Sequence, residues 1–194
     1  MPGPTLCVYC GSRLGDLPQF AQAASWAGTE IGRRGWNMVY GGGRSGLMGV
    51  VADAALAAGA RVIGVIPQSL MQRELGHTGL AQLHVVQTMH ERKLMMAQHA
   101  DAFLALPGGI GTFEELFEVW SWRQLGYHDK PLGLLNVEGY YDAFVSMMRD
   151  AQAHGFVTPA QHELLEIDSD PQRLLDTLGA RLPSATAPDD YRNI

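Results

Sequence analysis

The 194-residue chain has no run approaching the roughly 20 apolar residues that a membrane span requires. Its N-terminus lacks a basic segment followed by an apolar one, so we expect no signal peptide and a cytoplasmic location. Positive charge is scarce, with 14 Lys and Arg against 20 Asp and Glu and a formal net charge of −6. This balance argues against binding to a nucleic-acid polymer, which usually needs a basic surface, but not against binding a single nucleotide.

Cysteine is also scarce, since the chain has only Cys7 and Cys10, spaced as CxxC. That spacing occurs in redox and zinc sites. Here it lies in a strand-like run, where residues three apart point to opposite faces of a sheet. No second pair of Cys or His supplies further zinc ligands, and the seven histidines form no HExxH or similar pair. We therefore expect two buried core cysteines and no metal site.

Short apolar runs alternate with segments of helical periodicity along the chain. This alternation predicts an α/β fold with a doubly wound, mostly parallel sheet and helices on both faces. We expect one domain over residues 1–182 and a flexible tail over residues 183–194, and a loop or broken helix over residues 68–83. The predicted strands are 5–10, 37–40, 61–66, 83–87, 101–106, 130–136 and 163–168, and the predicted helices are 17–34, 47–58, 89–99, 112 onward, 140–154 and 171–178.

The central motif is the stretch 106–115, with the sequence LPGGIGTFEE. An apolar strand precedes it and an apolar-periodic helix follows it, so the motif is a strand, a glycine turn and a helix start. Gly108, Gly109 and Gly111 allow positive φ and let backbone N–H groups approach a ligand without an intervening Cβ. A helix N-terminus adds unpaired N–H donors and partial positive charge. The motif therefore predicts an anion site, most simply for a phosphate.

A second interpretation of the same stretch needs no ligand. Thr112 and Glu115 have the spacing of a capping box, in which Thr112 caps the helix and Glu115 reaches back to it. Both interpretations stay open on spacing alone. The three glycines favour the anion site, because a plain cap does not require them.

A second glycine-rich turn, over residues 41–49, also opens a predicted helix. Gly41, Gly43 and Gly46 match the dinucleotide fingerprint GxGxxG, but the turn follows the second strand and no acidic residue ends the next strand. We interpret it as phosphate- or nucleotide-contacting backbone. Three turns lie at strand carboxyl ends, namely this turn, Gly11-Ser12 and residues 108–111, and in a doubly wound sheet such turns can converge on one crevice.

Two cations lie early in the helix that follows the Thr88 capping box. Arg92 and Lys93 are close to a helix N-terminus, where positive charge opposes the helix dipole at a cost of about 0.3–1 kcal/mol. That cost is tolerable when the side chains have partners elsewhere. The alternative is a solvated charge pair on an amphipathic helix.

Together these motifs resemble those of the "lonely guy" (LOG) family of cytokinin riboside 5′-monophosphate phosphoribohydrolases, some of which were once labelled lysine decarboxylases. Pro107, Gly108, Gly109, Gly111, Thr112 and Glu115 match the family's PGGxGTxxE motif, and residues 10–12, 40–49, 89–93, 124–126 and 130–136 resemble further landmarks. The resemblance implies a Rossmann-like fold, a homodimer with the site near its interface, and no metal or organic cofactor. The implied reaction is hydrolysis of the N-glycosidic bond of an adenosine 5′-monophosphate to free base and ribose 5-phosphate.

The resemblance also implies roles for individual residues. Arg92 and Glu115 match the catalytic arginine and glutamate, and Ser121 lies where plant members often have threonine. The implied substrate-binding residues are Glu74, Arg92, Lys93, Gly109, Ile110, Gly111, Thr112, Phe113, Glu114, Glu115 and Ser121. The further residues expected to contact phosphate or nucleotide are Ser12, Gly42, Gly43, Gly46, Met48 and Gly108.

Other functions remain open at the level of the sequence. The base is adenine or an N6-substituted adenine, whose apolar group would need an apolar pocket, and Met89, Met95 and Met96 line either that pocket or the core. The chain could be an AMP nucleosidase without a cytokinin role or a nucleotide-binding protein without catalysis. A pyridoxal-phosphate decarboxylase needs a Schiff-base lysine, and only Lys93 and Lys130 exist. An NAD-dependent oxidoreductase rests on the second glycine turn alone.

Overall fold

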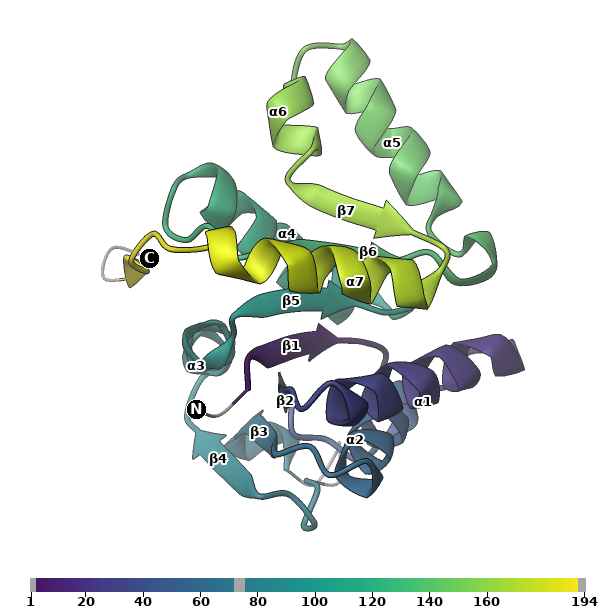
Figure 1. The fold of residues 1–194 in the computed structure, drawn as a ribbon, viewed down its shortest axis with the longest axis vertical. Coiled ribbons are helices and arrows are strands. Elements are labelled where there is room, and N and C mark those ends of the chain that lie inside the picture. The colour runs from purple at the N-terminus through teal and green to yellow at the C-terminus, as the bar shows by residue number, and fades with distance from the viewer. Residues whose placement is uncertain (1–2, 72–75, 192–194) are drawn as a thin grey trace.

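The computed structural model describes residues 3–71 and 76–191 (Figure 1). Within them, seven strands form one sheet in the order β4-β3-β2-β1-β5-β6-β7, and every pairing is parallel. The doubly wound parallel fold predicted from the sequence is thereby confirmed. The strands are β1 (Thr5–Tyr9), β2 (Asn37–Tyr40), β3 (Val62–Pro67), β4 (Gln82–Val86), β5 (Ala102–Ala105), β6 (Leu132–Leu135) and β7 (Leu165–Asp168).

The strand order reverses direction beside β1. From β1 the chain adds β2, β3 and β4 on one side, then returns to place β5 on the other side of β1. The loops that leave β1 and β5 therefore start next to each other and lead to opposite faces of the sheet. In Figure 1 the arrowheads of β1, β5 and β7 point to the same side, where these carboxyl ends lie. In open α/β sheets this reversal is where ligands bind.

Helices cover both faces of the sheet, and each face has its own core. One cluster of buried residues joins Leu6 and Val8 of β1, and Cys10 just after it, to α1, α2 and α7. The other joins Cys7 and Tyr9 to α3, α4 and α5. Because both faces are covered, β1, β2, β3, β5 and β6 are almost wholly buried and apolar. The α-helices are α1 (Pro18–Arg33), α2 (Gly46–Ala57), α3 (Met89–His99), α4 (Ile110–Gln124), α5 (Asp142–Ala153), α6 (Pro159–His162) and α7 (Pro171–Arg181).

The two cysteines confirm the interpretation of the CxxC spacing. Cys7 and Cys10 are buried free thiols in opposite cores, so the pair does not form one site. Thr88 caps α3 as expected, and its side chain accepts a hydrogen bond from the Glu91 N–H at 3.0 Å. Glu91 itself bonds to the N–H of Gln87, one residue before the cap.

The segment after Pro183 has defined partners, although the sequence predicts a flexible tail there. Tyr191 is only 8% exposed, and its ring lies 5.7 Å from that of Trp122. The buried Lys130 ammonium donates to Asp189 at 2.5 Å and to the Ala97 carbonyl at 2.9 Å. Lys130, two residues before β6, thus links the C-terminal segment to the end of α3. No local pattern in the tail reveals this contact.

Candidate active site

The loops after β1, β2 and β5 meet at the reversal point of the sheet. The Gly11 N–H donates to the Pro107 carbonyl at 3.0 Å, which joins the loop after β1 to the loop after β5. The Leu47 N–H donates to the Gly11 carbonyl, also at 3.0 Å, which adds the start of α2. The structure therefore brings together the three turns that the sequence places at strand carboxyl ends.

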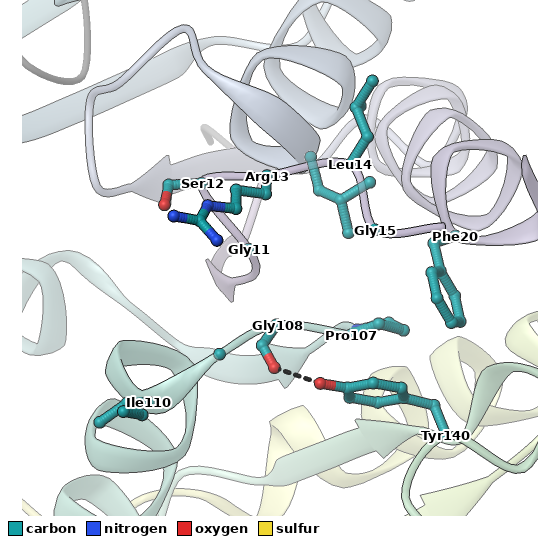
Figure 2. A pocket seen from close by; sticks show the side chains of 12 residues that line it. Gly11, Ser12, Arg13, Leu14, Gly15, Phe20, Pro107, Gly108, Ile110 and Tyr140 are labelled. Carbon is teal, nitrogen blue, oxygen red and sulfur yellow. Dashed lines mark hydrogen bonds between the residues drawn. The ribbon is translucent and has the colours of Figure 1, made fainter. Parts of the chain in front are cut away.

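A pocket of about 470 Å³ lies between these loops. Figure 2 shows Phe20 and Tyr140 facing each other on one side of it, with Ile110 on the first turn of α4. The Phe20 and Tyr140 rings meet edge to face at 5.3 Å, and the Tyr140 hydroxyl donates to the Gly108 carbonyl at 2.6 Å. Sequence reasoning missed both aromatic residues, which follow the ends of β1 and β6 by 11 and 5 residues, because no local pattern pairs them. The pocket is lined by Gly11, Ser12, Arg13, Leu14, Gly15, Phe20, Leu47, Pro107, Gly108, Gly109, Ile110 and Tyr140.

The helix of the central motif begins two residues before the predicted cap. Its N-cap is Gly109, without a side-chain cap, so Thr112 is inside the first turn and the expected capping box is wrong. Thr112 is instead buried against the preceding turn. A Cβ at Gly108 would lie 2.1 Å from the Thr112 Oγ1. Thr112 is thus a packed residue and not a cap. The N-cap, Gly109, has no side chain to cap the N–H groups at the start of α4.

Gly109 and Gly111 differ from Gly108 in having an open Cβ side. Both are exposed, and no protein atom lies within 4 Å of a Cβ built at either position. None of the three has positive φ, so that part of the expectation is wrong. The fold would accept a side chain at Gly109 and Gly111, and the open space lies beside the N–H groups of the first turn of α4.

The glycines of the second turn are mostly confined by the protein itself. Gly42 and Gly46 have positive φ, of 74° and 61°. A Cβ at Gly46 would lie 2.3 Å from the Arg13 nitrogen, and one at Gly49 would lie 2.1 Å from the Arg44 carbonyl oxygen. Met48 is buried in the core beside this turn. The turn also holds the β3–β4 connection through an isolated bridge between Gly43 and Gly76.

Arg92 reaches from α3 under the carboxyl ends of β2 and β3. Its side chain is 5% exposed. Its Nε donates to the Val65 carbonyl at 3.2 Å, and its Nη2 donates to the Gly41 carbonyl at 3.0 Å. These partners account for a cation near a helix N-terminus, and they hold the guanidinium at β3 and at the carboxyl end of β2.

Glu115 lies one turn into α4 and is partly buried. Burial raises the pKa of the Cys10 thiol, and the Glu115 carboxylate raises it further. Burial likewise raises the pKa of Cys7, where among smaller effects Glu115 raises it and Arg92 lowers it. Both charged groups therefore act on the same strand, β1, from α4 and α3. Glu115 and Arg92 thus both lie within electrostatic range of the Cys7 thiol, in the middle of β1.

Lys93 links α3 to α4 through two carboxylates. Its Nζ lies 2.5 Å from Glu114 Oε1 and 2.8 Å from Glu118 Oε1. Burial opposes the charge on Lys93, but the two carboxylates outweigh it and raise its pKa above the ordinary value. Of the residues that the resemblance implies, Lys93 and Glu114 are thus paired with each other beside the first turn of α4.

Other implied residues lie further from the crevice. The Phe113 ring packs against Tyr141 and Phe144 of the core, at 5.8 and 6.2 Å between ring centroids. Ser121 is exposed, six residues beyond Glu115 and therefore about 9 Å further along α4. Met96 belongs to the core, which favours the core interpretation for that methionine. Glu74 lies outside the described residues.

Within the described part of the chain, no cluster of three or more His, Cys, Asp or Glu side chains is arranged to hold a metal ion. No helix there has both the length and the apolar character needed to cross a bilayer.

Comparison with known proteins adds independent evidence at this point. A family model described as "Possible lysine decarboxylase" matches residues 48–178. Cytokinin riboside 5′-monophosphate phosphoribohydrolase LOG1 of Arabidopsis thaliana is 49% identical over 160 residues, which cover 82% of this chain and 75% of LOG1. The chain belongs to the LOG family. The LOG protein of Oryza sativa subsp. japonica is 53% identical over 152 residues, which cover 78% of this chain and 63% of that protein.

Solved structures of other proteins agree on the fold. A molybdenum cofactor binding protein from Rippkaea orientalis superposes with a TM-score of 0.71 at 20% identity, covering 93% of this chain and 98% of that one. DNA processing protein A from Helicobacter pylori superposes with a TM-score of 0.60 at 13% identity, covering 92% and 81% of the two chains. At such identities the likeness is one of fold alone, and it confirms the Rossmann-like architecture.

Proposed function

We propose that this chain hydrolyses the N-glycosidic bond of adenosine 5′-monophosphates, including N6-substituted ones, and releases the free base and ribose 5-phosphate. The single observation that carries the proposal is the glycine turn between β5 and α4, which is open at Gly109 and Gly111 and leads to Glu115, in a chain 49% identical to LOG1. The proposed reaction needs no cofactor, because water is the only reactant besides the nucleotide.

The first turn of α4 supplies a site for the 5′-phosphate. Gly109 and Gly111 leave open space beside backbone N–H groups at the positive end of a helix dipole. Binding energy from the phosphate, which does not react, would position the sugar for bond cleavage. Glu115 stands one turn further along the same helix, on the side of the sheet from which Arg92 approaches.

Cleavage of the glycosidic bond develops positive charge on the sugar, as in other glycoside hydrolyses. A carboxylate at Glu115 would stabilise that charge and orient the attacking water. Arg92 would bind the phosphate or assist the departing base, which gains electron density as the bond breaks. The roles require one anion and one cation beside the reacting bond, and we assign them to Glu115 of α4 and Arg92 of α3.

A chromatographic assay tests the proposal with AMP and isopentenyladenosine 5′-monophosphate as substrates. We expect the wild type to release free base and ribose 5-phosphate, and the ratio of the two rates to show which base is preferred. Glu115→Gln removes the charge but keeps the shape, and should lower kcat by about 100-fold or more. Glu163→Gln, an exposed change on the loop after α6, is the matched control and should leave kcat unchanged. Turnover by Glu115→Gln at the wild-type rate would contradict the proposal.

The positions of the chain's two lysines support nucleotide hydrolysis better than the lysine decarboxylation named in the family description. Lys93 is paired with Glu114 and Glu118, and Lys130 is buried under the C-terminal segment with Asp189. Neither ammonium is placed to form a Schiff base in the crevice, as pyridoxal-phosphate decarboxylation demands.

We further propose a cytoplasmic homodimer with the site near its interface. An exposed apolar stripe runs along α4, with Ile110 at 87%, Phe117 at 38% and Leu125 at 62% exposure. Ser121 lies between Phe117 and Leu125 at helical spacing, so a second copy covering the stripe would bring this residue toward a site. Two free thiols suit a reducing compartment. Light scattering of the purified chain measures the mass of the assembly.

A further inference from the structure

We propose that Gly41 is a positioning residue for Arg92: its missing side chain forms the slot in which the guanidinium lies. The catalytic part of this inference rests on the proposed function, whereas the structural part does not. Gly41 directly follows β2 and is buried. It is the first glycine of the turn that resembles a dinucleotide fingerprint, and none of the roles implied by the family resemblance falls on it.

The Arg92 guanidinium occupies the space that a side chain at position 41 would fill. The Arg92 Nη2 donates to the Gly41 carbonyl at 3.0 Å. A Cβ built on Gly41 would lie 2.0 Å from the same Nη2 and 3.0 Å from the guanidinium carbon. Real Cβ atoms do not approach other heavy atoms so closely, so an alanine at position 41 would force Arg92 out of its place.

Backbone conformation gives no competing reason for glycine at this position. Gly41 is absent from the residues with positive φ, in contrast to its neighbour Gly42. An alanine would therefore meet no backbone strain. The next nearest atom is the Met48 Sδ, 3.3 Å from the built Cβ, at the far end of a flexible side chain. Arg92 is thus the neighbour that excludes a side chain from position 41.

The slot fixes the guanidinium in two directions. The Gly41 carbonyl and the Val65 carbonyl hold its Nη2 and Nε from the ends of two adjacent strands. The long arginine side chain comes from α3, and two hydrogen bonds to rigid strands restrict its rotamers. Displacement by about 1 Å at a catalytic group can cost on the order of 100-fold in rate. Gly41 therefore controls where the charge of Arg92 stands relative to the crevice.

A double-mutant cycle tests this inference with Gly41→Ala, Arg92→Ala and the double variant. In the presence of Arg92, Gly41→Ala should lower the midpoint of urea unfolding by about 1 M, because the new methyl group overlaps the guanidinium. In the Arg92→Ala background the same change should leave the midpoint unchanged or raise it, since the overlapping group is gone. This rescue depends only on folding, so it holds even if the chain hydrolyses no nucleotide.

Activity provides the second arm of the cycle, read with an active wild type. Gly41→Ala should lower kcat by roughly 100-fold, and the double variant should be no slower than Arg92→Ala alone. A purely structural glycine would instead slow both backgrounds by the same factor. Equal loss of stability in both backgrounds, or a Gly41→Ala enzyme with wild-type kcat, would overturn the inference. If Gly41→Ala does not fold, folding of the double variant supports the slot and its failure overturns it.

Discussion

The two glycine-rich turns look alike in sequence but use glycine in opposite ways. In residues 41–49 most of the glycines are confined by protein atoms, as at Gly46, where a Cβ would meet the backbone of the loop after β1. In residues 107–111, Gly109 and Gly111 face space that no described protein atom fills. The turn of residues 41–49 supports the loops that form the crevice, and the turn of residues 107–111 borders the open part of the crevice.

This difference shows how a glycine motif should be interpreted. A glycine that a neighbour or a positive φ demands is explained by the fold, and needs no ligand. A glycine that the fold would let carry a side chain calls for another reason, and close approach of a ligand is one. The fingerprint-like spacing of residues 41–46 is therefore weaker evidence for a nucleotide than the less familiar PGGxGT sequence.

The largest effect on stability is expected at Gly46. Its φ of 61° strains any other residue, and its Cβ position lies 2.3 Å from backbone atoms of Ser12 and Arg13. Gly46→Ala should lower the free energy of unfolding by about 3 kcal/mol, from strain and overpacking together. Urea denaturation measures this change.

The matched control for Gly46→Ala is Gly126→Ala. Gly126 has a similar φ of 82°, but no atom lies within 4 Å of its built Cβ. It should cost only the backbone term, about 1 kcal/mol. Equal losses at the two positions would show that contact with the β1 loop contributes nothing at Gly46.

An intermediate and opposite effect is expected at Gly111. This residue is in the first turn of α4 with open space around it, so Gly111→Ala should stabilise the fold by up to about 1 kcal/mol through helix propensity. The same methyl group would occupy the proposed phosphate site and raise KM about 10-fold or more, a loss of about 1.4 kcal/mol in binding. Steady-state kinetics with AMP, together with urea denaturation, measure both changes.

Ser25→Ala serves as the control for Gly111→Ala, because it changes an exposed residue of α1 far from the turn. It should gain a few tenths of a kcal/mol in stability and leave KM unchanged. An unchanged KM in Gly111→Ala would remove the distinction between the two turns.

The smallest effect is expected at Tyr140, whose hydroxyl donates a hydrogen bond to the Gly108 carbonyl in the turn of residues 107–111. Tyr140→Phe keeps the ring against Phe20 and removes one hydrogen bond of a partly exposed residue, which should cost about 0.5–1 kcal/mol. Thermal unfolding measures the loss. A cost well above this range would mean that protein contacts fix the turn of residues 107–111 as strongly as the turn of residues 41–49.

Much of the fold follows from patterns along the chain. Continuous apolar runs such as β2 and β5 predict strands buried on both faces, and Gly35 and Gly155 mark the ends of α1 and α5 with positive φ. The four-residue helix α6 was missed, because so short a segment carries no periodicity. The structure also confirms that Cys7 and Cys10 lie on opposite faces, since alternation along a strand is a local property.

Local patterns failed where a distant contact decided the outcome. Thr112 has the spacing of a cap, but burial against Gly108 makes it part of the first turn of α4. Tyr191 belongs to a polar tail in the sequence, yet its ring packs beside Trp122 and its segment bonds to Lys130. In both cases the competing interaction joins residues whose proximity depends on the folded sheet.

The sequence by itself determined the parallel sheet, the turns at its carboxyl edge, the family and the residue types available for chemistry, because these depend on periodicity and on side-chain identity. Only the tertiary structure decided what each glycine is for and where Arg92 and Glu115 stand. Gly41 and Arg92 are 51 positions apart, and their contact exists only because β2, β3 and α3 pack together. Close approach between distant segments is a property of packing, which no local pattern encodes.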